Sequence, residues 1–310
     1  MRTPTARTTD TPNGEDVGTP PPSGPTELTL RALDRISVSA PYFAFDDLTS
    51  PSDGVITATM APSAPLLPEV GAVDASQVAR HLAILGSCAA ALTNPSDQRH
   101  HYLAVGATYA RLGDPPTRPV ADPMSVQATA HWVDKRTATA SMTLAGPDGN
   151  RLNRLDVTYA VMKPNMFRRL NPPVETTHQA SDPSASGRVE RTLIERARGI
   201  VMADCGPVTE AMCAGHFPGH PAAPVAVVMG QLVRTARDAL CSHLGTEVAY
   251  RVEAGTVEAN RLAQPGQRLT MEAEHRSSEP DGTHLLDGRA LADGEQVGSV
   301  SVRLAPIAAV

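Results

Sequence analysis

Apolar side chains recur at helical spacing in two long stretches of the chain, residues 74–92 and 224–244. Intervals of three and four residues place these side chains on one face of an α-helix. Because both stretches are also largely apolar outside that stripe, each is typical of a helix buried inside a domain. The stripes consist of Val78, Leu82, Leu85 and Cys88 in the first stretch and of Val228, Leu232, Ala236, Leu240 and Leu244 in the second.

Alternating apolar and polar residues follow each predicted helix, which is the pattern of strands with one buried face. Turn sequences separate neighbouring segments, and Asp148-Gly149 and Asp293-Gly294 are hairpin signals. The sequence therefore predicts about four antiparallel strands after each helix, and a short strand or two before it. The later strands are expected over 101–107, 125–132, 138–144 and 152–162 in the first half, and over 248–254, 268–276, 284–291 and 297–304 in the second.

The same order of elements occurs twice, which indicates an internal repeat. A long helix wrapped by a curved antiparallel sheet is the hotdog arrangement, so the pattern predicts an α+β chain built as a double hotdog. Pro-rich stretches on either side of the first unit cannot bury enough apolar surface to order themselves. We expect a disordered Pro/Thr-rich tail at 1–26, a first unit at 27–165, a linker at 166–187 and a second unit at 188–310.

The chain has 310 residues, a formal net charge of −6 and 41% hydrophobic residues, which are ordinary values for a globular protein. It has no basic block, so neither nucleic acid nor an anionic membrane surface is an expected partner. No apolar run approaches the roughly 18 residues of a membrane-spanning helix. The N-terminal residues also lack the apolar core of a secretory signal. These features predict a cytoplasmic protein without a membrane span.

Metal and cofactor motifs are not found. The four cysteines form no CxxC pair, and they are interpreted as buried small hydrophobic residues in a reducing compartment. His100-His101 has no metal-ligand spacing, and neither a Walker loop nor a GxGxxG turn occurs. The sequence therefore predicts no metal, no nucleotide and no other cofactor.

The run GHFPGHPAAP at residues 215–224 directly precedes the second predicted helix. It closely resembles the HFPGxPxxPG loop of the bacterial 3-hydroxyacyl-carrier-protein dehydratases, which are hotdog proteins. The resemblance is strong over about 210–245, extends through the strands to 304, and is architectural in the first half. More broadly, the chain is similar to the double-hotdog proteins that act on acyl thioesters.

The resemblance implies a dehydratase-like enzyme that acts on a 3-hydroxyacyl or polyketide thioester, carried by acyl carrier protein or CoA, in fatty-acid-like or secondary-metabolite biosynthesis. His216 would be the base that removes the α-proton, since a histidine titrates near neutral pH. Free N–H groups at the start of the helix near Pro224 would hold the thioester carbonyl as it becomes an enolate. Gly219 would allow close approach of the substrate. Phe217 is expected beside it, with core packing as the favoured role.

The second catalytic group is less easily assigned, because the carboxylate of the dehydratases lies fourteen positions after the histidine and that position is Gly230 here. In a paired hotdog the histidine faces the helix of the other unit. Matching the two helices places Arg80 at the counterpart of Gly230, with His81 beside it, and both Arg80 and Gly230 are expected to contact the substrate. An arginine cannot donate its proton usefully, so His81 and Asp74 are the candidate acids. Asp74 is alternatively a helix N-cap, the favoured role, and His81 a core histidine.

Two other functions stay open. A hotdog thioesterase or acyltransferase would use an oriented water instead of the hydroxyl chemistry, and a non-catalytic acyl-binding partner subunit would explain the missing carboxylate. The corresponding loop of the first half, residues 60–68, has no histidine, so one pocket between the halves, or none, is expected to be active. The basic run at 167–169 is interpreted as a solvated strand end, with carrier-protein docking as the alternative. A homo-oligomer is possible.

Overall fold

The structure is a computed structural model, and it describes residues 24–61, 68–71, 73–113, 122–172 and 191–307. The N-terminal tail expected at 1–26 lies outside these residues except for its last three. Most of the expected linker and of the loop at 60–68 also lies outside them. The elements of the first half are α1 (Glu27–Arg35), β1 (Thr49–Ser52), β2 (Val55–Met60), α2 (Ala75–Leu92), β3 (His101–Arg111), β4 (Met124–Trp132), β5 (Thr137–Ala145), β6 (Arg151–Met162) and α3 (Pro164–Leu170).

The second half repeats this order of strands around a second long helix. Its elements are β7 (Thr192–Ala197), β8 (Ile200–Pro207), α4 (Glu210–Cys213), α5 (Val225–Leu244), β9 (Ala249–Ala259), β10 (Arg268–Ser278), β11 (His284–Ala292) and β12 (Glu295–Ile307). Both predicted helices and all eight predicted later strands are therefore present, with ends that differ from the expected ones by a few residues.

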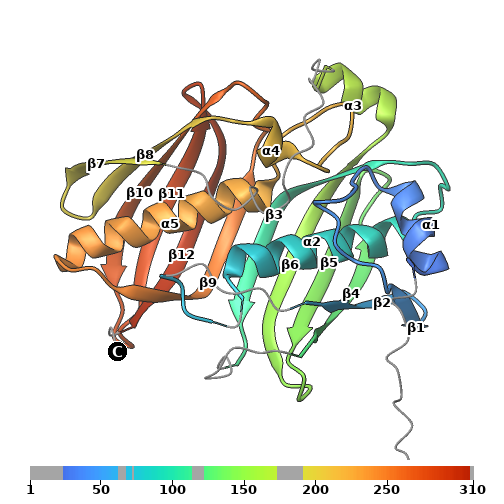
Figure 1. Cartoon of the computed structure of the whole chain (residues 1–310), viewed down its shortest axis with the longest axis horizontal. Helices are drawn as coiled ribbons and strands as arrows, with labels where there is room; N and C mark the ends of the chain where they lie inside the picture. Colours follow the sequence, from blue (N-terminus) through green and yellow to red (C-terminus); the bar gives the residue numbers. More distant parts are fainter. Residues whose placement is uncertain (1–23, 62–67, 72, 114–121, 173–190, 308–310) are drawn as a thin grey trace, which may run out of the picture.

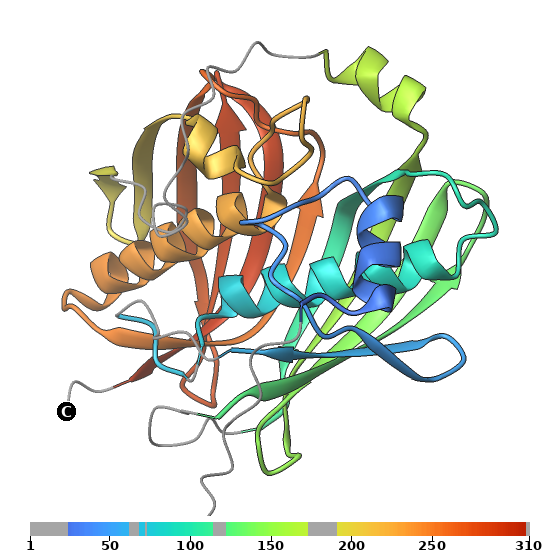
Figure 2. The ribbon, with the colours of Figure 1, turned by 45° about the vertical axis from the view of Figure 1, so that its right-hand side comes forward.

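The described strands form one antiparallel sheet in the order β1-β2-β4-β5-β6-β3-β9-β12-β11-β10-β8-β7. The two halves join where β3 pairs with β9, in a register that runs from Gly106 opposite Glu258 to Ala110 opposite Ala254. In Figure 1, α2 and α5 each lie across the sheet of their own half, and Figure 2 shows both helices on the same side of the sheet. Helix α2 also contacts α5, so the halves meet through helices as well as strands.

Each long helix buries the stripe that its spacing predicted. Val78, Leu82 and Leu85 are at most 1% exposed beneath β4 and β5. Leu232 and Leu240 are fully buried on α5 in the same way. Asp74 begins α2 by accepting the Gln77 N–H at 2.8 Å, and Gly245, with φ at 74°, ends α5 in the left-handed region. None of the described helices is long and apolar enough to cross a membrane.

The short helices were not predicted, and one of them corrects an interpretation. The basic run at 167–169 lies on α3 rather than at a strand end, and Pro164 stands in the first turn of that helix, where its missing N–H costs nothing. Phe167 is fully buried on the same helix. Because α3 spans the boundary expected at 165/166, the division into domains stays a prediction.

Candidate active site

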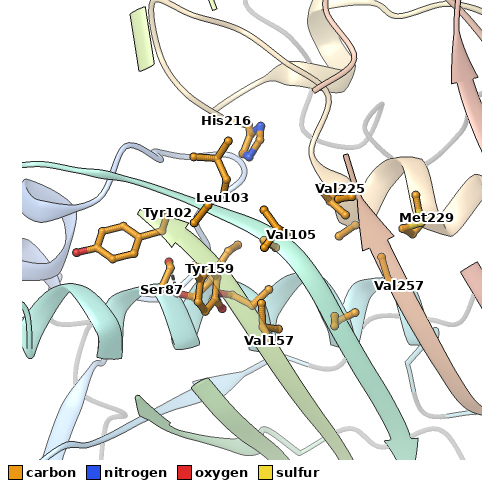
Figure 3. Close-up of a pocket in the computed structure, with 18 of the residues that line it drawn as sticks. Ser87, Tyr102, Leu103, Val105, Val157, Tyr159, His216, Val225, Met229 and Val257 are labelled. Carbon is orange, nitrogen blue, oxygen red and sulfur yellow. Dashed lines mark hydrogen bonds between the residues drawn. The ribbon is translucent and has the colours of Figure 1, made fainter. Parts of the chain in front are cut away.

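A cavity of about 220 Å³ opens between the two halves, and its walls are mainly apolar. Helix α2 and strands β3 and β6 supply one wall, while α5, β9 and the loop that carries His216 supply the other. Figure 3 shows His216 at one end of this cavity, with Tyr102, Leu103 and Val105 on β3 and Val225 and Met229 on α5. An apolar space of this kind suits a hydrocarbon chain.

Backbone pairing with the first half fixes the loop of His216. The loop lies between α4 and α5, and His216 forms an isolated bridge with Val38. The Phe217 N–H donates to the Ser37 carbonyl at 3.1 Å. At Gly215, where φ is 75°, a Cβ would lie 2.3 Å from the Ser39 carbonyl oxygen, so only glycine fits. The first half therefore holds the motif of the second.

The His216 ring is held as a neutral base. Its Nδ1 lies 2.8 Å from the Ala222 carbonyl oxygen, which can only accept, so Nδ1 carries the proton and Nε2 keeps its lone pair. The ring stacks on Phe217 at 3.9 Å and meets Tyr42 edge-on at 5.0 Å. Burial lowers the pKa of His216 to about 4, against the opposing effect of the Ala222 hydrogen bond. At neutral pH, Nε2 can accept a proton at the cavity.

Tyr42 lies between His216 and Arg80. The Arg80 guanidinium carbon is 5.7 Å from the centre of the Tyr42 ring, and Tyr42 itself lines the cavity. Burial raises the pKa of Tyr42 to about 12, while the positive charge of Arg80 acts in the opposite direction. Arg80, proposed from sequence as a substrate-binding residue, therefore reaches the site only through this aromatic ring.

The N-terminus of α5 also opens on the cavity. Val225 and Ala226 both line it, and an α-helix leaves its first N–H groups without partners inside the helix. The N-cap residue Pro224 supplies no side-chain hydrogen bond to them. These donors, together with the positive end of the helix, form a site suited to an oxygen that gains negative charge.

Helix α3 packs over the outer side of the motif loop. The ring of Phe167 stacks on His101 at 3.8 Å and meets Phe217 at 4.9 Å. His220 lies edge-on to Phe167, and its Nδ1 donates to the Asn171 carbonyl at 2.8 Å. Phe217 thus lines the cavity and also packs into the interior, whereas His220 does not line the cavity.

The two candidate acids do not line the cavity. Besides capping α2, Asp74 accepts a hydrogen bond from the Ser76 hydroxyl at 2.6 Å, which is the capping role that the sequence also allowed. His81 donates from Nδ1 to the Gln77 carbonyl at 2.8 Å, and its ring lies edge-on to Phe45. Burial, then the charge of Arg80, lowers the pKa of His81 to about 4. Both side chains are accounted for by contacts on or beside α2.

Gly230 lies at the contact between the two long helices rather than on the cavity wall. A Cβ at this position would lie 2.9 Å from the Ser76 Cβ and 3.0 Å from its Oγ. A carboxylate side chain therefore has no room where the dehydratase pattern would place one. Gly219, with φ at 81°, has open space around it, and neither it nor Pro224 is among the residues that line the cavity.

Sequence reasoning missed most of the polar groups in the cavity wall. The Ser87 hydroxyl donates to the Ile84 carbonyl at 2.7 Å, and the Tyr159 hydroxyl donates to the Ala83 carbonyl at 2.6 Å. The spacing of Ala79, Ala83 and Ser87 was the available signal, because three small side chains four residues apart leave a groove along a helix. That stripe lies beside the larger apolar stripe that predicted the core.

A buried acid, Glu69, was also missed. Its Oε1 accepts the Ala75 N–H at 2.8 Å, and its Oε2 accepts from the Tyr250 hydroxyl at 3.3 Å. Burial, followed by the negative charge of Asp74, raises its pKa to about 7. Glu69 lines a separate small cleft with Tyr109 rather than the cavity of His216.

Comparisons with known proteins agree with this architecture. No protein-family profile matches the chain. A 116-residue stretch is 29% identical to the 3-hydroxyacyl-[acyl-carrier-protein] dehydratase FabZ of Granulibacter bethesdensis and covers 33% of this chain and 68% of that protein. A conserved hot dog fold protein of unknown function from Alicyclobacillus acidocaldarius superposes over 88% of this chain and 100% of its own, with a TM-score of 0.54 and 12% identity.

The chain has the hotdog fold. Two further structures of this kind cover most of it. The TesB protein of Mycobacterium avium subsp. paratuberculosis matches 84% of this hotdog protein and 96% of its own chain, with a TM-score of 0.55 and 13% identity. The 12:0-ACP thioesterase of Umbellularia californica matches 82% and 94%, with a TM-score of 0.54 and 12% identity. This hotdog protein thus resembles acyl-thioester proteins of the same fold.

Proposed function

We propose that this hotdog protein is a double hotdog that acts on acyl thioesters, with dehydration of a 3-hydroxyacyl thioester as its reaction. The observation that carries the proposal is His216, held neutral with its Nε2 lone pair free at an apolar cavity. The match to a FabZ dehydratase supports the same assignment. The acyl chain would occupy the cavity, and the thioester carbonyl would lie at the N-terminus of α5.

The proposed reaction uses His216 twice. Nε2 removes the α-proton while N–H groups of Val225 and Ala226 stabilise the enolate oxygen. The enolate electrons then form the α,β double bond as the C–O bond to the β-hydroxyl breaks. The proton held on Nε2 passes to that oxygen, which leaves as water. Burial favours this second transfer because it lowers the pKa of the imidazolium.

The residues that line the cavity are consistent with His216 acting as both the base and the acid. Among the described residues that line it, none is an aspartate or a glutamate. Gly230 stands where the dehydratase pattern has its carboxylate, and Ser76 fills the space beside it. In the proposed mechanism His216 itself therefore supplies the acid, and Asp74 and His81 stabilise α2.

Thioester hydrolysis is the second candidate, and the same lack of a carboxylate favours it. His216 would take a proton from water, the water would attack the carbonyl carbon, and the products would be a free acid and a thiol. The Umbellularia californica protein is named as a 12:0-ACP thioesterase. The binding site for the carbonyl oxygen would be the same in both reactions.

Two product assays on one substrate distinguish these reactions. The substrate is a 3-hydroxyacyl thioester, supplied on CoA and on acyl carrier protein. Dehydration yields the conjugated 2-enoyl thioester, which is followed by its ultraviolet absorbance, whereas hydrolysis releases a thiol that a colorimetric reagent detects. Formation of the enoyl product without thiol supports the dehydratase, and the reverse supports the thioesterase.

His216→Gln tests the proposed base. We expect it to lower turnover by roughly a hundredfold or more, the usual contribution of a positioned acid-base group. His220→Gln is the matched control in the same loop, because His220 does not line the cavity, and we expect its turnover to stay within a fewfold of the wild type. Full activity in folded His216→Gln protein contradicts the proposed chemistry, and acyl binding without any turnover identifies a binding subunit instead.

A further inference from the structure

Three histidines from three elements converge at the end of α5 that lies far from the cavity. His243 is in the last turn of α5, His275 is on β10, and His284 begins β11. One ring nitrogen from each lies within 4.8 Å of the others. His284 is buried, and the other two are half-buried, so the cluster is sheltered but reachable from solvent.

The nitrogen atoms are close to the spacing of metal ligands. His275 Nε2 lies 3.0 Å from His284 Nδ1, and two nitrogens on a tetrahedral zinc ion lie about 3.3 Å apart when each Zn–N bond is about 2.0–2.1 Å. The Ser278 hydroxyl lies 3.1 Å from the same His284 nitrogen and 3.5 Å from His275 Nε2. Two imidazoles and a hydroxyl therefore already face one point.

His243 completes the cluster after a rotation of its ring. Its ring stacks on that of His275, with centroids 3.6 Å apart and an angle of 12° between the planes. Stacked rings point their lone pairs in parallel, so His243 must turn about its side-chain bonds to aim a nitrogen at the shared point. His243 lies in the last turn of α5 and is only partly buried.

The backbone around the cluster favours a cation. The C-terminal end of α5 carries the negative end of the helix dipole, and His243 lies in that last turn. Gly199, between β7 and β8, covers the cluster: a Cβ there would lie 3.3 Å from the His275 Cβ and 3.5 Å from the His243 Cβ. The Arg198 Nε donates to the His243 carbonyl oxygen at 2.8 Å, so one positive charge already lies at this helix end and partly offsets that preference.

We propose that His243, His275 and His284 form a binding site for one divalent transition-metal ion of the zinc class. Imidazole nitrogen is a preferred ligand of zinc, and three such ligands leave a fourth position for water or the Ser278 hydroxyl. The site joins the C-terminus of α5 to the β10–β11 hairpin. It lies about 27 Å along the α5 axis from Val225, by the rise of an α-helix, which places it apart from the cavity of His216.

A direct hydrogen bond between two neutral imidazoles is the competing explanation of the short distance. It accounts for His275 and His284, but it leaves His243 without a role other than stacking. A metal ion gives all three rings, and the adjacent hydroxyl, a common partner.

The test is calorimetric titration of the full chain, stripped with a chelator, with zinc chloride at neutral pH. We expect one zinc ion per chain and a higher melting temperature when zinc is bound, since an ion that binds only the folded state stabilises it. Cobalt in place of zinc should give the strong visible bands of a tetrahedral site. His275→Ala and His243→Ala should each weaken binding by more than the roughly 10- to 100-fold that an outer partner contributes.

His131→Ala is the matched control, because His131 is exposed on β4 and outside the cluster. It should bind zinc as the wild type does. His243 is half-exposed, so His243→Ala tests the site even if a variant at a more buried ring fails to fold. Absence of zinc binding in the wild type overturns the proposal. Wild-type affinity for zinc in the folded His243→Ala and His275→Ala proteins overturns it as well.

Discussion

His216 is the residue on which the proposed chemistry depends, and its low pKa makes a prediction about pH. Burial lowers that pKa to about 4, so the base stays unprotonated well below the usual histidine value near 6.5. We expect kcat/KM to change little between about pH 5.5 and 8 and to fall only near about pH 4, well below the range of an exposed histidine. Initial rates across this range, with folding checked at each pH, test it, and a half-loss near pH 6.5 contradicts it.

Glu69 is the residue whose ionisation should oppose folding. Its pKa is about 7 in the folded chain against 4.5 for the free side chain. Below pH 4.5 the acid is protonated in both states and has no effect. Between pH 4.5 and 7 the unfolded state releases this proton while the folded state keeps it, so the free energy of unfolding falls as pH rises. At full ionisation the loss is on the order of 3 kcal/mol.

Glu69→Gln removes this titration while it keeps an oxygen for the Ala75 N–H. The stability of the variant relative to wild type should therefore rise between pH 4.5 and 7 and then level off. Urea unfolding of both proteins across that range measures the difference in their free energies of unfolding. The titration of the histidines cancels in this difference because both proteins share them. A difference that does not vary with pH contradicts the assignment.

The crossing of α2 and α5 depends on small side chains at Gly230 and Ser76. Replacing a helical glycine by alanine ordinarily stabilises by about 0.5–1 kcal/mol. Here the added Cβ would lie 2.9 Å from the Ser76 Cβ, so Gly230→Ala should instead cost about 1–3 kcal/mol. Ser76→Gly in the same chain should recover part of the loss. Urea unfolding of the double-mutant cycle measures this coupling, and a stabilised Gly230→Ala protein would show that the helices do not meet there.

Helix α3 should stabilise the motif loop through one side chain. Phe167 is fully buried against His101 and Phe217, so Phe167→Ala should cost about 3–5 kcal/mol. Met166 is the matched control on the same helix, because it is exposed and its replacement by alanine should change stability by no more than about 0.5 kcal/mol. Thermal unfolding of both variants checks the contrast. Equal, small effects would mean that α3 is not docked.

The whole molecule should need both halves, because β3 and β9 are paired with each other at the centre of the sheet. A fragment of residues 24–172 or 188–310 would expose one of these strands as an open edge and would lose one wall of the cavity. We expect each fragment alone to self-associate or stay unfolded, and the mixed fragments to form a one-to-one complex. Analytical ultracentrifugation with circular dichroism tests this, and a monomeric, fully folded single fragment contradicts it.

The sequence by itself determined the long elements and the motif. Helices and strands follow from the period of apolar residues, which is a local property of the backbone, and so α2, α5 and the strands from β3 to β6 and β9 to β12 could be predicted. The loop of His216 could be found from the spacing of its prolines and of Gly219 along the sequence. The short helix α3 escaped because seven residues with Pro164 at the start carry too little period to distinguish a helix from a strand end.

Only the tertiary structure decided which side chains meet. It brings Tyr42 and Val38 from the first half onto His216, and it turns Ser76 rather than an acid toward Gly230. It also gathers His243, His275 and His284, whose spacing along the chain shows no ligand pattern. The physical reason is that periodicity fixes the face on which a residue lies, whereas the pairing of β3 with β9 and the crossing of two helices fix what that face touches.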